Sequence, residues 1–176
     1  ALHYLDEQDV KSLNIKAEKN ISLILGGPNK YYSFSYEKIK NVFLQLTKDS
    51  EINKINIVAS RRTPIKLFEK LKNEFQDPRI VYDFSLNKNN YTKSLSEASH
   101  IFVTCDSISM ISEAAITEKP IYVVQLKIIK DDYRFKRFFK LFHELGIIRY
   151  FEGQIENWTY EKLYETKRIS NIIIEN

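Results

Sequence analysis

The chain has 176 residues, 43% of them hydrophobic and 13% aromatic, which excludes a disordered chain and is enough for one domain with a sizeable core. Lysine and arginine total 27 against 23 acidic residues; the net charge of +4 suits phosphate-bearing ligands, but no clustered basic patch points to nucleic acid. The single cysteine, Cys105, excludes an internal disulfide and a cysteine-based zinc site, and no apolar run approaches the length of a membrane span, so we expect a reducing, cytoplasmic setting.

The first half of the chain alternates strand and helix patterns. Residues 1–20 are polar and poorly periodic, and we interpret them as a lead-in from a missing N-terminal domain. Residues 21–25 predict a strand that ends in a Gly-Gly-Pro-Asn turn, and residues 36–48 predict a helix with one apolar face. Residues 55–59 predict a second strand. It is followed by a helix for which Thr63 is the expected N-cap and Pro64 the first helical residue.

The second half continues the alternation. Strands are predicted at residues 79–84, 101–104 and 121–124, and helices at 91–98, from 107 onward and at 132–145, with Gly146 ending the last. Repeated strand–helix units with nearly unbroken apolar strands predict an α/β fold with a Rossmann-like parallel sheet covered by helices on both faces. We assign residues 21–155 to this domain and residues 156–176 to a C-terminal helical tail.

Three polar turns follow strands, and ligands of parallel sheets bind at the carboxyl ends of the strands. In the first turn, Gly26 and Gly27 allow backbone N–H groups to approach an anion, with Asn29 beside them. The spacing matches no dinucleotide or P-loop motif, so a tight structural turn is an equal alternative. The second turn is Ser60-Arg61-Arg62. Its two guanidinium groups suit a phosphate, or they form a surface basic pair, and the sequence does not separate Arg61 from Arg62.

The third turn, residues 104–113, combines hydroxyl groups with two acids. Thr104, Ser107 and Ser109 lie where free helix N–H groups can meet a diphosphate, and Glu113 follows Ser109 by one helical turn, where it could bind a ribose diol. Asp106 is either a ligand contact or only the N-cap of this helix, and its charge would repel a phosphate. A helix terminus could lower the pKa of Cys105, but no histidine neighbours it in sequence, which disfavours a nucleophile.

Other features have simpler interpretations. The three histidines show no metal-site spacing, and we expect neither a metal nor a cofactor. The helix at 132–145 carries a basic face, which is a solvated surface or a contact for a membrane or a protein. This face consists of Arg134, Lys136, Arg137 and Lys140.

Four segments resemble the ELM1-like family, which is named for a plant mitochondrial-fission factor and has many bacterial members. They are Leu25-Gly26-Gly27-Pro28-Asn29-Lys30, Ser60-Arg61-Arg62-Thr63-Pro64, Asp106-Ser107-Ile108-Ser109-Met110-Ile111-Ser112-Glu113-Ala114 and Trp158-Thr159-Tyr160. They follow in order through nearly the whole chain, and the Asp-Ser-x-Ser-Met-x-Ser-Glu-Ala block is the most specific. Related sequences usually carry glycine where this chain has Glu118.

The resemblance implies the C-terminal half of a GT-B glycosyltransferase-like architecture, in which this half binds a nucleotide-sugar donor. The acid matching Glu113 then binds ribose, the turn before it meets the diphosphate, and the missing N-terminal domain contributes the acceptor site. Such a domain alone is expected to be inactive. The alternatives are a non-enzymatic adaptor that kept the fold and a nucleotide-sugar epimerase. The nucleotide, the sugar and the catalytic base stay open.

Overall fold

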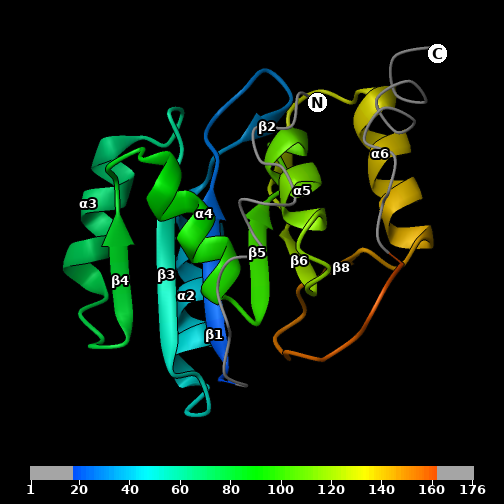
Figure 1. The fold of residues 1–176 in the computed structure, drawn as a ribbon. Helices are drawn as coiled ribbons and strands as arrows, with labels where there is room; N and C mark the ends of the chain where they lie inside the picture. The colour runs from blue at the N-terminus through cyan, green and yellow to red at the C-terminus, as the bar shows by residue number, and fades with distance from the viewer. Residues whose placement is uncertain (1–17, 162–176) are drawn as a thin grey trace.

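A computed structural model of the chain describes residues 18–161, and a parallel sheet forms their centre (Figure 1). Every neighbouring pair of strands in this sheet is parallel. Its strands, in chain order, are β1 (Asn20–Leu25), β3 (Lys54–Ala59), β4 (Ile80–Asp83), β5 (His100–Thr104), β6 (Ile121–Val124) and β8 (Ile148–Tyr150). The residues of β1, β5 and β6 are almost all buried, because helices cover both faces.

The spatial order of the strands is β4-β3-β1-β5-β6-β8. If the six strands are counted along the chain, this is the order 3-2-1-4-5-6 of doubly wound nucleotide-binding folds. The chain reverses its direction of winding between β1 and β5, and the helices that follow these two strands lie on opposite faces of the sheet. The predicted Rossmann-like α/β fold is therefore confirmed.

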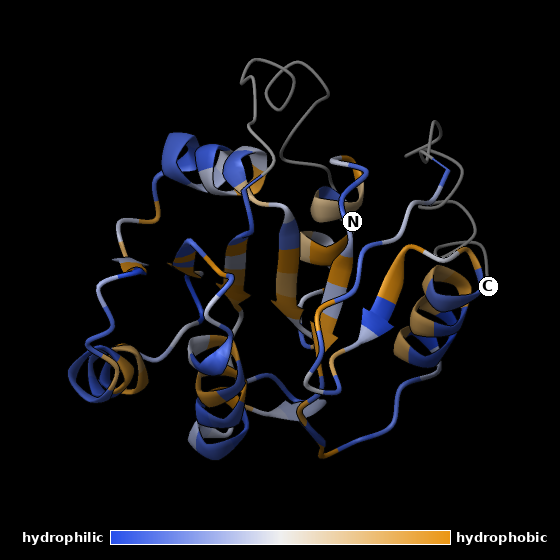
Figure 2. Ribbon diagram, turned by 90° about the horizontal axis from the view of Figure 1, so that it is seen from below, coloured by the Kyte–Doolittle hydropathy of each residue, from blue (hydrophilic) through white to orange (hydrophobic). Residues whose placement is uncertain are grey.

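Helices fill the connections between strands. They are α2 (Tyr36–Lys48), α3 (Ile65–Glu74), α4 (Lys88–Glu97), α5 (Ile108–Ala115) and α6 (Tyr133–Glu144). In Figures 1 and 2, α2 and α3 cover one face of the sheet, α4 and α5 cover the other, and α6 lies beside β8 at one edge. Figure 2 shows the apolar strands enclosed by helices whose outer sides are hydrophilic. Buried Phe138 and Phe142 of α6, with ring centroids 4.1 Å apart, close the core at that edge.

The structure adds features that the pattern did not predict. A two-stranded antiparallel ribbon joins β2 (Tyr32–Ser33) to β7 (Lys127–Ile128), and β8 is a further strand of the main sheet. Helix α4 starts at Lys88, earlier than predicted, because the Asn87 side chain accepts from the backbone N–H groups of Asn89 and Asn90. Residues 156–161 are irregular; the rest of the predicted helical tail and most of the predicted lead-in lie outside the described residues.

The turn after α5 contains a residue in an unusual backbone conformation. Glu118 has a φ of 60°, in the left-handed region that favours glycine. Glu118 stands where the resemblance leads us to expect glycine, and it adopts a backbone conformation that glycine takes more easily. The next residue, Lys119, packs inward. Its ammonium donates to Leu95 O at 2.7 Å and to Ser96 O, two carbonyls at the end of α4.

Candidate functional site

Two of the predicted turns meet at the point where the sheet reverses its winding. The loop after β1 is bonded to the loop after β5: Gly26 N–H donates to Thr104 Oγ1 at 2.8 Å, and Gly27 N–H donates to Asp106 Oδ2 at 3.0 Å. The Asp106 side chain is fully buried. The Gly27 N–H group therefore binds an acid of the chain itself, in the place where an external anion was predicted.

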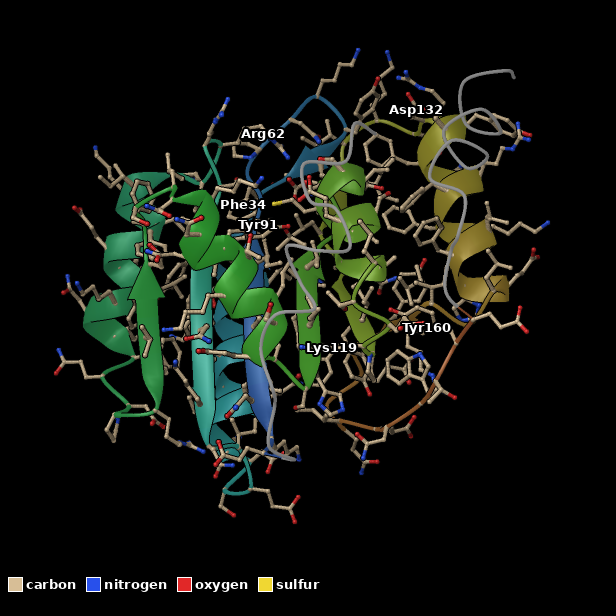
Figure 3. The ribbon with its side chains drawn as sticks, viewed as in Figure 1. Phe34, Arg62, Tyr91, Lys119, Asp132 and Tyr160 are labelled. Atoms are coloured by element: carbon tan, nitrogen blue, oxygen red, sulfur yellow. The ribbon has the colours of Figure 1, made fainter. Side chains whose placement is uncertain are left out.

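The turn after β3 joins this arrangement through Arg62. Its Nη2 lies 2.8 Å from Asp106 Oδ2, and its Nη1 donates to Gly27 O at 2.9 Å. The guanidinium thus ties three loops together and pairs the charge that would have repelled a phosphate. Figure 3 shows Arg62 at the upper end of the sheet, near Tyr91. The structure separates the two arginines, since Arg61 makes no ion pair with any residue of the 18–161 region.

Close contact explains both glycines. A Cβ atom on Gly26 would lie 2.1 Å from Asp106 Oδ2, and one on Gly27 would lie 2.0 Å from the backbone oxygen of Arg62. No side chain fits at either position. Asn29 strengthens the same turn: its Nδ2 donates to Asp106 O at 3.3 Å, and its Oδ1 accepts from the N–H groups of Tyr31 and Tyr32.

Two predicted helix caps are wrong. The N-cap of α5 is Ser107, not Asp106, because the Asp106 carboxylate turns away toward Gly27 and Arg62. The N-cap of α3 is Pro64, and the Thr63 hydroxyl points back to the carbonyl oxygens of Leu25 and Gly26, at 2.9 and 2.7 Å. Both side chains are buried, and they hold the loops together.

The expected lowering of the Cys105 pKa is also wrong. Burial raises the pKa of this thiol to about 12, and the nearby charge of Asp106 adds to the effect. The sulfur accepts a hydrogen bond from Leu126 N at 3.3 Å. Cys105 is therefore a neutral, packed thiol.

A cleft of about 510 Å³ opens beside these loops, over the carboxyl ends of β1, β3 and β4. It collects residues from the second and third predicted turns and from one segment that was not predicted. The predicted residues that line it are Ser60, Arg61, Arg62, Ser107, Ser109 and Glu113. The other five, Gly26, Gly27, Asn29, Thr104 and Asp106, do not line it and are hydrogen-bonded to one another.

Glu113 forms one wall of the cleft from within α5. It is only 7% exposed, and its Oε2 accepts a hydrogen bond from the Tyr91 hydroxyl at 2.8 Å. Burial and the neighbouring Glu113 raise the pKa of Tyr91 well above its usual value, so the phenol stays protonated and holds the carboxylate in place.

The N-terminus of α5 forms the adjacent wall. Its first helical hydrogen bond runs from Ile111 N to Ser107 O, at 3.2 Å, so the N–H groups of Ile108, Ser109 and Met110 have no acceptor within the helix. The Ser107 and Ser109 hydroxyls lie 3.5 Å apart, and Ser109 is exposed. This end of the helix therefore presents hydrogen-bond donors and partial positive charge to the cleft.

Comparison with known proteins supports the resemblance in the motifs. The sequence profile of the family described as Mitochondrial fission ELM1 matches residues 1–176. This chain belongs to that family. It is 34% identical over 161 residues to the uncharacterized protein RP120 of Rickettsia prowazekii (strain Madrid E). The aligned region covers 86% of this chain and 45% of that protein. It is 34% identical over 116 residues to the mitochondrial fission protein ELM1 of Arabidopsis thaliana, covering 64% and 27%.

This ELM1-family chain spans less than half the length of both curated relatives. Within residues 18–161, no group of three or more histidine, cysteine, aspartate or glutamate side chains could hold a metal ion. No helix in the same range has the length and apolar character needed to cross a membrane.

Sequence reasoning missed the contribution of the β4–α4 connection to the cleft. This segment supplies Asp83, Leu86, Asn87, Lys88 and Tyr91. Leu86 is 51% exposed and has a φ of 57°, an unusual conformation for a residue with a branched side chain. The polar run at residues 87–90 was the available signal, because it too follows a strand at its carboxyl end.

The predicted basic face on α6 is partly neutralised. Arg134 pairs with Asp132 at 3.0 Å, Lys136 with Asp131 at 3.1 Å, and Lys140 with Glu144 at 3.9 Å. Apart from the Asp132 side chain, which is 14% exposed, the partners are exposed, so each pair contributes little to stability, but together they reduce the positive field of the helix. Whether this ELM1-family surface meets a protein or a membrane stays a prediction.

Proposed function

We propose that the cleft binds the nucleoside diphosphate part of a nucleotide sugar. One observation carries the proposal: Arg61, the N-terminus of α5 and Glu113 converge on a single cleft beside the winding reversal of a doubly wound sheet. Open α/β sheets bind nucleotides at this point. A volume of about 510 Å³ lies within the usual range for small-molecule sites.

Each wall has a distinct role in this proposal. Arg61 and the free N–H groups at the start of α5 bind the diphosphate, because both offer donors and positive charge. Glu113 accepts hydrogen bonds from the ribose diol, and Tyr91 keeps its carboxylate oriented. Arg62 also lines the cleft; it neutralises Asp106 and so removes the repulsion that this acid would exert on a phosphate.

We further propose that this domain is the donor-binding half of a glycosyltransferase-like protein of GT-B architecture. The family membership and the Rossmann-like sheet support this proposal, and the greater length of the curated relatives leaves room for a second domain. The acceptor and the catalytic base would then come from outside the described residues, and the domain alone would bind a donor without transferring its sugar.

Calorimetric titration of the chain with UDP, GDP and their sugars tests the proposal. We expect binding of at least one of these ligands, and about tenfold weaker binding in Arg61→Gln, because a charge-assisted hydrogen bond to phosphate is lost. Glu113→Gln should weaken the binding of the nucleotide sugar by a similar factor and the binding of inorganic pyrophosphate much less, because only the nucleotide sugar carries the ribose diol.

The matched control is Arg149→Gln. Arg149 is a partly exposed arginine that pairs with Glu156 and does not line the cleft. It should bind as the wild type does. If no nucleotide or nucleotide sugar binds, or if Arg61→Gln and Arg149→Gln behave alike, the proposed site is wrong.

A further inference from the structure

A second cavity lies on the other side of the β5–α5 turn. Its volume is about 900 Å³, and it opens between α6, β7 and the carboxyl ends of the strands. Cys105 lines this cavity, whereas Ser107, two residues later, lines the cleft of about 510 Å³ described above. One turn of the chain therefore separates two spaces with different linings.

The inner wall of the second cavity is apolar and aromatic. It is formed by Tyr32, Cys105, Leu126, Phe139 and Tyr150, which come from five separate parts of the chain. The first four of these are each less than 9% exposed, so the cavity reaches the edge of the main core. The hydroxyls of Tyr32 and Tyr150 make no hydrogen bond with residues 18–161, and burial raises the pKa of both phenols, which keeps them protonated.

The rim of the same cavity is basic. Four lysines surround it, Lys38 from α2, Lys127 from β7, and Lys136 and Lys140 from α6, against one acid, Glu144. Lys136 is held by Asp131 and Lys140 lies 3.9 Å from Glu144. Lys38 and Lys127 make no ion pair within the described region, so their charges are available to a ligand.

An apolar interior below a basic rim matches a molecule with an apolar chain and an anionic head. We propose that this lysine-rimmed cavity binds a single-chain amphiphile with a phosphate or carboxylate head group. The chain lies against Leu126, Phe139 and Tyr150, and the head group meets Lys38 and Lys127. The ligand is a free monomer, or the same chemistry presented by the anionic head group and one acyl chain of a lipid in a bilayer. This proposal does not depend on nucleotide binding in the other cleft.

Calorimetric titration of the full chain with dodecyl phosphate, below its critical micelle concentration, tests the cavity. We expect saturable binding to one site, with dodecanol and inorganic phosphate each at least about tenfold weaker, because each lacks one half of the recognised chemistry. Lys38→Gln with Lys127→Gln should weaken dodecyl phosphate by about tenfold and leave dodecanol unchanged. The control pair Lys66→Gln with Lys72→Gln removes the same charge from α3, outside the cavity.

A second variant tests the interior without altering charge. Gln125 is exposed and lines the cavity, so Gln125→Trp should fill part of it and abolish dodecyl phosphate binding while the thermal midpoint stays unchanged. Vesicles of anionic phospholipid distinguish the two sources of the ligand. Vesicle binding that needs Lys38, Lys127 and an open cavity identifies a bilayer lipid as the ligand.

Two results would overturn the proposal. One is binding of dodecyl phosphate that both lysine pairs weaken equally, since this indicates general attraction to a positive surface. The other is vesicle binding that Gln125→Trp does not affect, with no binding of the monomer, since this places the lipid contact outside the cavity.

Discussion

Replacing Arg62 by methionine tests whether its ion pair with the buried carboxylate of Asp106 stabilises the loops of the site. Methionine keeps much of the apolar stem of the side chain but removes both hydrogen bonds, to Asp106 Oδ2 and to Gly27 O. The Asp106 carboxylate would keep the Gly27 N–H, at 3.0 Å, as its only hydrogen-bond donor among residues 18–161. Its other oxygen, Oδ1, is buried and has no partner in this region even with Arg62 in place.

The expected loss of stability follows from the burial of the two partners. Removing one partner of a buried ion pair costs about 3–5 kcal/mol. The Asp106 side chain is 0% exposed but that of Arg62 is 41% exposed, so water reaches one end of the pair and we expect about 2–3 kcal/mol. For a domain of this size, this corresponds to a fall of about 5–10 °C in thermal midpoint.

Urea unfolding of four proteins measures the pair itself: wild type, Arg62→Met, Asp106→Asn and the double variant. The losses in free energy of unfolding of the two single variants, added together, should exceed the loss of the double variant by at least about 1 kcal/mol. The reason is that Asp106→Asn removes the buried charge that Arg62→Met leaves without a partner. Arg149→Met is the control, since its partner Glu156 is 59% exposed, and it should cost less than about 1 kcal/mol. Additive losses, or an Arg62→Met cost equal to the control, would refute this account of the site.

Three further predictions concern single residues. Gly27→Ala should lower the free energy of unfolding by about 3 kcal/mol, because the added Cβ would lie 2.0 Å from the backbone oxygen of Arg62, which cannot move aside as a side chain could. An unchanged urea midpoint would contradict the loop geometry. Cys105, whose pKa burial raises to about 12, should react with a thiol reagent at pH 8 at least about a hundredfold more slowly in the native chain than in denaturant, and equal rates would show an open thiol. Burial lowers the pKa of Lys119 to about 8, below its ordinary 10.5. Between these pH values the unfolded chain holds more protons than the native chain, so the free energy of unfolding of the wild type should rise with pH relative to that of Lys119→Met. A difference between the two proteins that stays constant with pH would count against the buried ammonium.

The regular elements of this fold were predictable because strand and helix patterns dominate their segments. Strands such as Asn20–Leu25 and Lys54–Ala59 are apolar runs bounded by polar turns, and the helix Tyr36–Lys48 buries residues at helical spacing. The short elements β2, β7 and β8 were not predictable, because two or three residues carry no periodic signal. Their pairing depends on partners far away in the sequence.

The candidate site was predictable in its location and only partly in its contacts. Parallel strands place their carboxyl ends together, so the three polar turns had to meet. No local pattern indicates that Asp106 turns toward Gly27 and Arg62, because that choice depends on loops separated by dozens of residues. The same limit explains Tyr91, whose bond to Glu113 crosses from α4 to α5 and is set by tertiary packing.

The position of β1 between β3 and β5 has a consequence for folding. One edge of β1 pairs with β3, close in the chain, but its other edge pairs with β5, where Ile21 lies opposite His100. During synthesis the edge of β1 that receives β5 therefore waits, unpaired, until residues near 100 have been made. Such long-range closure slows folding, and an unpaired apolar strand edge promotes association between chains. Pulse-labelled chains released before residue 100 should aggregate, whereas full-length chains, in which β5 and β6 complete the sheet, should not.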